Sequence, residues 1–133
     1  MAIDFAENIL NGKHSSYKLG SMLGSGGMAL VYHATDMRTS TPVAIKMMYD
    51  WLANSTETIS RFYREIKIIS ALSHPHIVPI IDSGEYNNRP FMVMPYYQSG
   101  SLASYIQSNP EVTVGQSLLW LSEIASALEY AHP

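Results

Sequence analysis

The sequence has no cysteine among its 133 residues, which excludes disulfide bonds and thiolate metal sites. Charged residues are also scarce, at 14%, and the basic ones do not predominate: eight lysines and arginines stand against eleven aspartates and glutamates, for a net charge of −3. A nucleic-acid-binding surface needs a basic patch or stripe that neutralises phosphates. We therefore expect no nucleic-acid partner.

Long apolar runs are absent as well. No run is long enough to cross a bilayer, and the N-terminus lacks the basic-then-apolar order of a signal peptide. The five histidines include no H-E-x-x-H pair, so no metal site is expected. Hydrophobic residues make up 47% of the chain, enough for the core of one ordinary domain. These features predict a soluble, cytoplasmic domain without a membrane segment.

Glycine is concentrated in one stretch, "LGSGGMALVY" (residues 23–32), which has three glycines in four positions between apolar flanks. A tight hairpin needs one or two glycines, so the surplus predicts a backbone that approaches another group closely, most often a phosphate. A flexible hairpin is the plain alternative. A dinucleotide-binding loop is a third, but that loop leads from a strand into a helix. Here the alternating "LVYHAT" that follows predicts a second strand.

Hydrophobic periodicity predicts an α+β chain. Strands are expected at 17–23, 30–35, 43–49, 77–86 and 89–97, the last two joined by a turn at Asn87–Asn88. An apolar stripe over 59–72 predicts a helix capped by Ser55 or Thr56 and ended before Pro75. A short helix should follow Gly100 and a longer one should cover 114–132, whereas residues 1–16 predict a poorly fixed arm.

Two charged residues stand in apolar surroundings. Lys46 belongs to the predicted strand "VAIKMMY" and shares a face with Ala44, two positions earlier. Burying an ammonium group among apolar side chains is unfavourable unless it meets an anion. Glu65 lies on the predicted helix among apolar neighbours of the inward stripe. A solvent-exposed lysine or glutamate is the plain reading of each residue alone.

Five segments then occur in a specific order: "LGSGGMALVY", "VAIK", "RFYREI", "HPHIV" and "FMVMPYYQSGSL". Together they resemble the N-terminal lobe of a serine/threonine protein kinase, closest to the bacterial eukaryotic-like branch. The glycine-rich loop and V-A-I-K are known signatures of that family. The resemblance covers about residues 17–132. It implies a five-stranded antiparallel sheet with one major helix, followed by two helices of a C-lobe.

The resemblance also implies roles for individual residues. Lys46 would hold the α- and β-phosphates of ATP and pair with Glu65. Met94 matches the gatekeeper position, Pro95 and Tyr97 the hinge, and Ser101 a ribose contact. The implied ATP-binding set is Leu23, Gly24, Ser25, Gly26, Gly27, Met28, Ala29, Val31, Ala44, Lys46, Met94, Pro95, Tyr97 and Ser101. Ile69 and Ile80 match an apolar column between helix and sheet, whereas His74 and His76 are interpreted as turn residues.

On this reading, residues 1–16 are an arm, 17–98 the ATP-binding lobe and 99–133 the first helices of an incomplete C-lobe. Residues 1–133 contain neither the His-Arg-Asp nor the Asp-Phe-Gly motif that the family uses for catalysis and for Mg²⁺. The Mg²⁺ ligands would lie beyond residue 133, and the chain alone is expected to be inactive towards protein substrates. A non-catalytic, pseudokinase-like interaction module or a truncated gene product is the alternative. The apolar helix 114–132 further predicts self-association.

Overall fold

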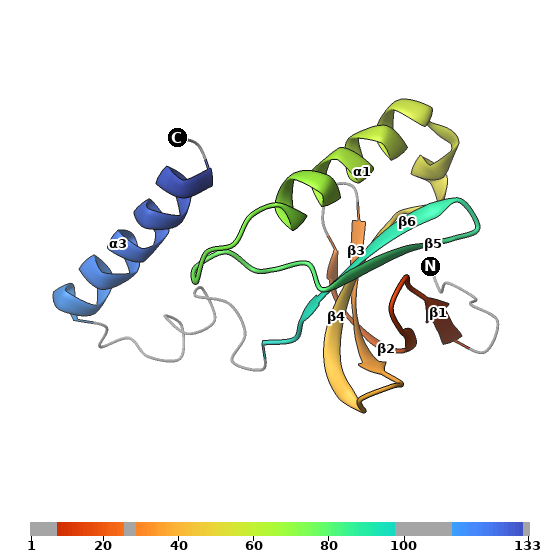
Figure 1. Ribbon diagram of the computed structural model, residues 1–133, viewed down its shortest axis with the longest axis horizontal. Helices are drawn as coiled ribbons and strands as arrows, with labels where there is room; N and C mark the ends of the chain where they lie inside the picture. Colours follow the sequence, from red (N-terminus) through yellow and green to blue (C-terminus); the bar gives the residue numbers. More distant parts are fainter. Residues whose placement is uncertain (1–7, 26–28, 98–112, 132–133) are drawn as a thin grey trace. The chain divides into compact units, whose positions relative to one another are not determined.

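Six antiparallel strands form one sheet in the computed structural model, which describes residues 8–25, 29–97 and 113–131 (Figure 1). The strand order is β1-β2-β3-β4-β6-β5. The strands are β1 (Ile9–Asn11), β2 (Ser16–Ser25), β3 (Ala29–Asp36), β4 (Thr41–Met48), β5 (Asp82–Tyr86) and β6 (Arg89–Pro95). The chain divides into two compact units, the first of residues 1–71 and 79–96 and the second of residues 72–78 and 97–133. The sheet belongs to the first unit.

The first strand corrects the expectation of an N-terminal arm and raises the strand count from five to six. β1 pairs with β2 in the register Ile9↔Lys18 and Leu10↔Tyr17. Leu10 is fully buried, and burial of a leucine side chain favours the paired state by about 1.5–3 kcal/mol. A bridge between Gly12 and Gly84 then connects this end of the sheet to β5 at the other end.

The other strands agree with the sequence-based expectation to within two residues at each end, except at the start of the segment expected at 77–86. The segment expected as a strand from residue 77 is extended only from Asp82. Pro79 lies within the missing part and lacks the N–H that a strand ladder requires. The predicted turn at Asn87–Asn88 is confirmed, and both residues have positive φ, 49° and 64°. Asparagine tolerates that conformation, which suits the two-residue hairpin between β5 and β6.

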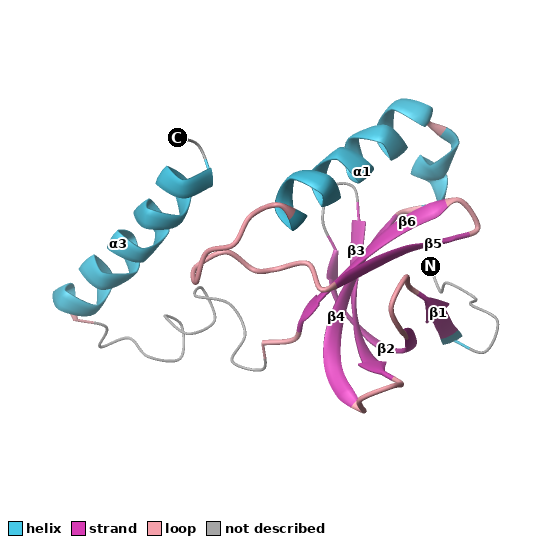
Figure 2. Ribbon diagram, viewed as in Figure 1, coloured by secondary structure: helices cyan, strands magenta, loops and turns pink. Residues whose placement is uncertain are grey.

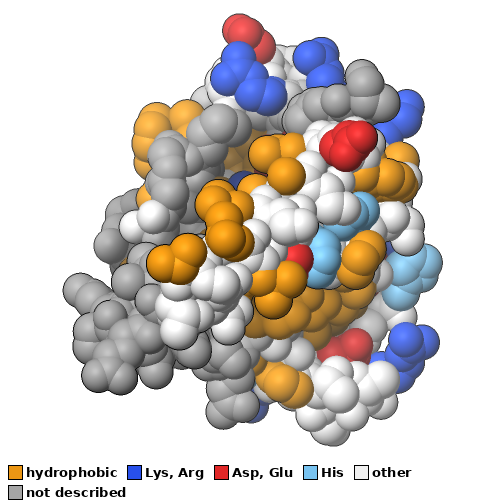
Figure 3. Space-filling model, turned by 90° about the vertical axis from the view of Figure 1, so that its left-hand side faces the viewer, with side chains coloured by type: hydrophobic (Ala, Val, Ile, Leu, Met, Phe, Trp, Pro, Cys, Tyr) orange, Lys and Arg blue, Asp and Glu red, His pale blue; other side chains and the backbone are white. Residues whose placement is uncertain are grey.

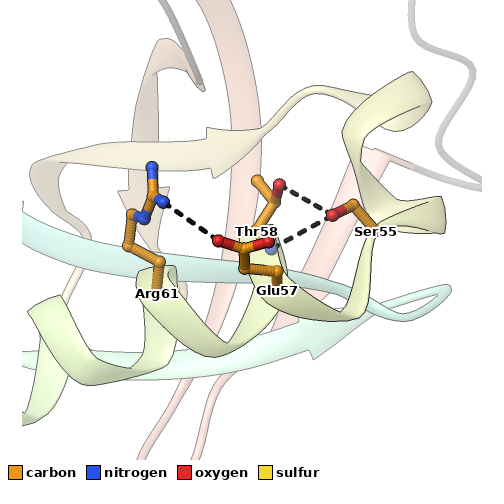
Figure 4. A network of polar contacts seen from close by, with 4 residues as sticks. All are labelled: Ser55, Glu57, Thr58 and Arg61. Atoms are coloured by element: carbon orange, nitrogen blue, oxygen red, sulfur yellow. Dashed lines mark hydrogen bonds and ion pairs between the residues drawn. The ribbon is translucent and has the colours of Figure 1, made fainter.

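The major helix is α1 (Thr56–Ser70), preceded by a short 3-10 turn, η2 (Asp50–Asn54). Ser55 caps α1, as its sequence position predicts, because its side chain accepts a hydrogen bond from the Thr58 N–H at 3.2 Å (Figure 4). One turn further on, Arg61 and Glu57 form an exposed ion pair at 3.5 Å, as the same view shows. Phe62 and Ile66 form the buried side of the helix.

The core consists of two clusters on opposite faces of the sheet, and the alternation along β4 separates them. Val43, Ile45 and Met47 face the first cluster, which also holds Leu10 and Phe91. Met48 faces the second cluster, where Phe62 and Ile66 of α1 pack against Ala29 and Met92. Helix α1 therefore covers the face to which Lys46 belongs (Figure 2).

In the second unit, the structure describes the segment around His74 and His76 and helix α3 (Val114–Ala131). The two histidines contact α3 and are more than turn residues. The His74 ring lies 3.0 Å from the Ser126 hydroxyl, and His76 Nδ1 lies 3.3 Å from Glu123 Oε2. Sequence patterns do not reveal these pairs because the partners are distant along the chain. The short helix expected after Gly100 lies outside the described residues.

Candidate functional site

The pairing of Lys46 with Glu65 is the central feature of the site. Strand β4 carries Lys46 and α1 carries Glu65, and the distance between Lys46 Nζ and Glu65 Oε1 is 3.4 Å. The side chains retain 33% and 40% of their exposure, so each charge faces its partner while staying accessible to solvent or ligand. An exposed pair of this kind adds little stability, about 0–1 kcal/mol. The main effect of the ion pair is therefore to position the Lys46 ammonium group above the sheet.

Apolar residues surround the ammonium on the same face. The strand registers pair Val31 with Lys46, and Ala44 with Met94. Directly paired residues of antiparallel strands share a face, so these three apolar side chains lie with Lys46 on one surface. Val31, Ala44 and Met94 are all half-buried, which leaves part of each available for contact. The sequence-based grouping of these residues with Lys46 agrees with this geometry.

The glycine-rich segment connects β2 to β3, as the alternation of "LVYHAT" predicts. Gly24 pairs with Val31, and Ser25 pairs with Leu30, so the turn begins directly beside the apolar surface. Leu23 and Ser25 are exposed. Gly26, Gly27 and Met28 lie outside the described residues. The strand-turn-strand context disfavours the dinucleotide-binding alternative, which requires a helix after the glycines.

Ala29, which occupies the third glycine position of the motif, is buried in the second core cluster. Its side chain contacts the interior, so only its backbone is in a position to meet a ligand. Met94 packs against the same cluster and is followed by Pro95 at the end of β6. Tyr97 is exposed and belongs to the second unit. Ser101 lies outside the described residues.

His33 and Tyr96 were not singled out by the sequence analysis, yet they border the same surface. His33 pairs with Ala44, so it shares the face of Val31 two positions earlier in β3. The His33 and Tyr96 rings meet edge to face, with centroids 4.8 Å apart. The alternation along β3 could have identified His33, because residues 31 and 33 lie on one face.

Helix α1 is held to the sheet close to Glu65. The Tyr63 hydroxyl donates a 2.5 Å hydrogen bond to Glu85 Oε2 of β5. Burial and this bond to a carboxylate raise the pKa of Tyr63 to about 12. On the inner side, Ile66 is buried in the second core cluster and Ile80 packs against that cluster, whereas Ile69, the other residue expected in the apolar column, is half-buried. These contacts fix the rotation of the helix that presents Glu65.

The described part of the chain contains no cluster of metal-ligating side chains. In residues 8–25, 29–97 and 113–131, no three histidine, aspartate or glutamate side chains gather closely enough to hold a metal ion. Within the same described ranges, no helix has the length and apolarity needed to span a membrane. The surface around Lys46 offers a cation oriented by Glu65, beside the apolar side chains of Val31, Ala44 and Met94.

Three features define the nucleotide-binding lobe of protein kinases: two strands joined by a glycine-rich segment, a lysine on the next strand and a glutamate on the adjacent helix. Residues 17–133 match the model of the protein kinase domain, and the chain belongs to that family. It is 39% identical over 126 residues to the serine/threonine-protein kinase PrkC of Bacillus subtilis. It is 32% identical over 120 residues to the serine/threonine-protein kinase PknB of Mycobacterium leprae.

The coverage of these relatives is unequal. The alignments include 93% and 87% of this chain but only 19% of PrkC and 19% of PknB. Among solved structures, the PknI kinase domain of Mycobacterium tuberculosis aligns with a TM-score of 0.72 and 27% identity, over 97% of this chain and 52% of that one. The chain thus spans about a fifth of the curated relatives and about half of a solved kinase domain.

Proposed function

We propose that this chain binds ATP and is the nucleotide-binding part of a bacterial serine/threonine protein kinase, which transfers the γ-phosphate of ATP to protein hydroxyls. In this proposal residues 17–98 form the ATP-binding lobe and residues 99–133 begin the C-lobe. The observation that carries it is the Lys46–Glu65 pair beside Val31 and Ala44. A cation held by a carboxylate next to an apolar surface suits a ligand with phosphates at one end and a base at the other.

Each group has a distinct task in this proposal. Lys46 would neutralise charge on the α- and β-phosphates, while Glu65 would orient its ammonium group. Val31 and Ala44 would contact the adenine ring, beside Leu23, and Met94 would border its inner edge. The backbone carbonyl of Pro95 and the N–H of Tyr97 would read the adenine edge, since proline lacks only the donor. Mg²⁺ would arrive with the nucleotide.

Gly24 gives independent support for a ligand at the turn. A Cβ added to Gly24 would meet no described atom within 4 Å, and its φ is not in the left-handed region. Within the described residues, neither a steric contact nor a left-handed φ therefore demands glycine at this position. A close approach by a phosphate would explain it.

Nucleotide binding can be tested by the melting temperature of the purified chain with and without Mg·ATP. We expect ATP to raise the melting temperature, and Lys46→Met to abolish most of the rise. The matched control is Lys18→Met, because Lys18 is an exposed lysine of β2 and should leave the rise intact. An equal rise in wild type and Lys46→Met would reject the proposed role of the lysine.

Phosphotransfer is a separate matter. Positioning of the nucleophile and of Mg²⁺ in this family depends on motifs that residues 1–133 do not contain. We propose that a polypeptide of these residues binds ATP without phosphorylating proteins. Incorporation of radiolabelled phosphate into a generic protein substrate, lost in Lys46→Met, would contradict this.

A non-catalytic interaction module is the second candidate, favoured by the exposed apolar residues of α3. In that case binding of a partner, or of a second copy through α3, would be indifferent to Lys46→Met. Retention of partner binding together with no response to ATP would favour the module over the nucleotide-binding lobe.

A further inference from the structure

A cavity lies on the face of the sheet opposite to Lys46, away from the candidate site described above. It has a volume of about 300 Å³ and is lined by Met22, Ser25, Leu30, Tyr49, Trp51 and Arg89, with Asp50 beside them. Leu30 pairs with Met47, whereas its neighbour Val31 pairs with Lys46. Since successive strand residues point to opposite faces, a ligand in this cavity would not share the site beside Lys46. All of its lining residues belong to the first unit.

The walls of the cavity expose aromatic and apolar surface. Trp51 retains 64% and Met22 58% of its exposure, so both side chains offer apolar surface to a ligand in the cavity. The rings of Tyr49 and Trp51 stack with centroids 5.8 Å apart and an interplanar angle of 25°. A stacked pair of this kind gives a flat apolar platform on which a further ring can pack.

The polar side of the cavity is fixed in place. Arg89 is buried, and its Nε and Nη2 atoms donate hydrogen bonds of 3.0 and 2.8 Å to the carbonyl of Met48. A guanidinium held in this way attracts acidic groups such as carboxylates and sulfonates. Asp50 also lines the cavity and interacts electrostatically with Arg89, which offsets part of the positive charge, so a singly charged acid suits the cavity better than a polyphosphate.

We propose that this cavity binds a flat aromatic acid, whose ring packs on Trp51 and Tyr49 and whose acidic group faces Arg89. A molecule of two fused rings fits the volume, and binding would bury the apolar surface of Trp51 and Met22. Pockets for small ligands typically combine apolar walls with a few fixed polar groups in this way.

The test uses 1-anilinonaphthalene-8-sulfonate, a fused-ring sulfonate whose fluorescence rises when it leaves water. It is titrated into the purified chain without nucleotide. We expect at least a tenfold loss of affinity for the cavity in Trp51→Ala and in Met22→Ser. Both side chains are exposed, so the folded state should persist, and melting curves verify this.

The apolar surface of α3 is a competing site for this probe, and Leu121→Ser is the matched control because Leu121 is a similarly exposed residue of that helix. Unchanged affinity in Trp51→Ala, or a loss confined to Leu121→Ser, would overturn the cavity proposal. Because the titration contains no nucleotide, its outcome is independent of the proposed ATP-binding function.

Discussion

Asp82 joins the N-terminal segment to the sheet through its buried carboxylate. It accepts hydrogen bonds from the Tyr17 hydroxyl at 2.7 Å and from the backbone N–H groups of Lys13, His14 and Ser83 at 2.7–3.1 Å. Burial alone would raise the pKa of Asp82, but these bonds, led by that from Tyr17, together lower it below its usual range. The ionised form is therefore stabilised by folding.

The lowered pKa of Asp82 predicts that the fold becomes less stable in acid. A group whose pKa is lower in the folded state stabilises the fold above its unfolded pKa, and the contribution is lost as pH falls through the folded value. Asp82→Asn should lower the free energy of unfolding at pH 7 by about 1–3 kcal/mol and reduce the loss between pH 7 and pH 3. Urea unfolding at both pH values measures this. Glu57→Gln, at a highly exposed carboxyl, is the control, and an equal acid loss in wild type and Asp82→Asn would contradict the prediction.

The raised pKa of Tyr63 predicts that the stability of the fold decreases as pH rises in the alkaline range, opposite to the effect of Asp82 in acid. Burial, and then the bond to Glu85, raises the pKa of Tyr63 from 10.0 to about 12. A raised pKa stabilises the fold below the unfolded value, and this contribution is lost as pH rises from 10 towards 12. Tyr63→Phe should therefore flatten the decline in stability over that range. Tyr97→Phe, at an exposed tyrosine, should not; a decline that is the same in wild type and Tyr63→Phe would refute the assignment.

A functional residue could be identified from the sequence where the residues that reveal it lie close to it along the chain, and was missed where they lie far away. Lys46 and Glu65 stand out because a charged residue in an apolar run is visible within a few positions. Asp82 gives no such signal, since its partners Tyr17, His14 and Lys13 lie 65–69 positions away. Its importance depends on the closure of the sheet, which no local pattern encodes.

The same contrast holds for whole elements. Helix α1 could be predicted together with its cap, because Ser55 and the apolar stripe are local features. β1 could not, because it has three residues and is stabilised by pairing with β2 and by burial of Leu10. Short edge strands depend on their neighbours rather than on their own sequence.

The segment after β1 closes the sheet, and this closure predicts different effects on stability for substitutions at two glycines. A Cβ added to Gly12 would lie 2.3 Å from Asp82 Oδ2 and 3.0 Å from the Tyr17 ring, whereas one added to Gly24 would meet nothing within 4 Å. Gly12→Ala should therefore destabilise the fold by about 1–3 kcal/mol, as overpacking does, and Gly24→Ala should be neutral within about 0.5 kcal/mol. Thermal unfolding of both variants decides; equal stability would argue against a tight closure at Gly12.

At the scale of the whole molecule, the first unit has its own core, with apolar clusters on both faces of the sheet. The described part of the second unit differs, since of the residues of α3 whose side chains are described only Ala127 is buried. Hydrophobic side chains are exposed in several patches of the face shown in Figure 3. The sequence predicted this helix and its apolar character correctly, but the burial of a helix depends on what packs against it.

We propose that residues 1–133 self-associate through the exposed apolar residues of α3. Leu118 and Leu121 are 61% and 62% exposed, and their transfer from water favours contact between copies by about 25 cal/mol per Å² buried. Sedimentation velocity at increasing concentration should show species larger than a monomer, and the double variant Leu118→Ser/Leu121→Ser should shift the population towards the monomer. Met37→Ser removes a comparably exposed apolar side chain from the first unit and should leave the distribution unchanged. A single monomeric species at high concentration in the wild type would reject self-association by this helix, because exposed leucines would then be tolerated in water without a partner.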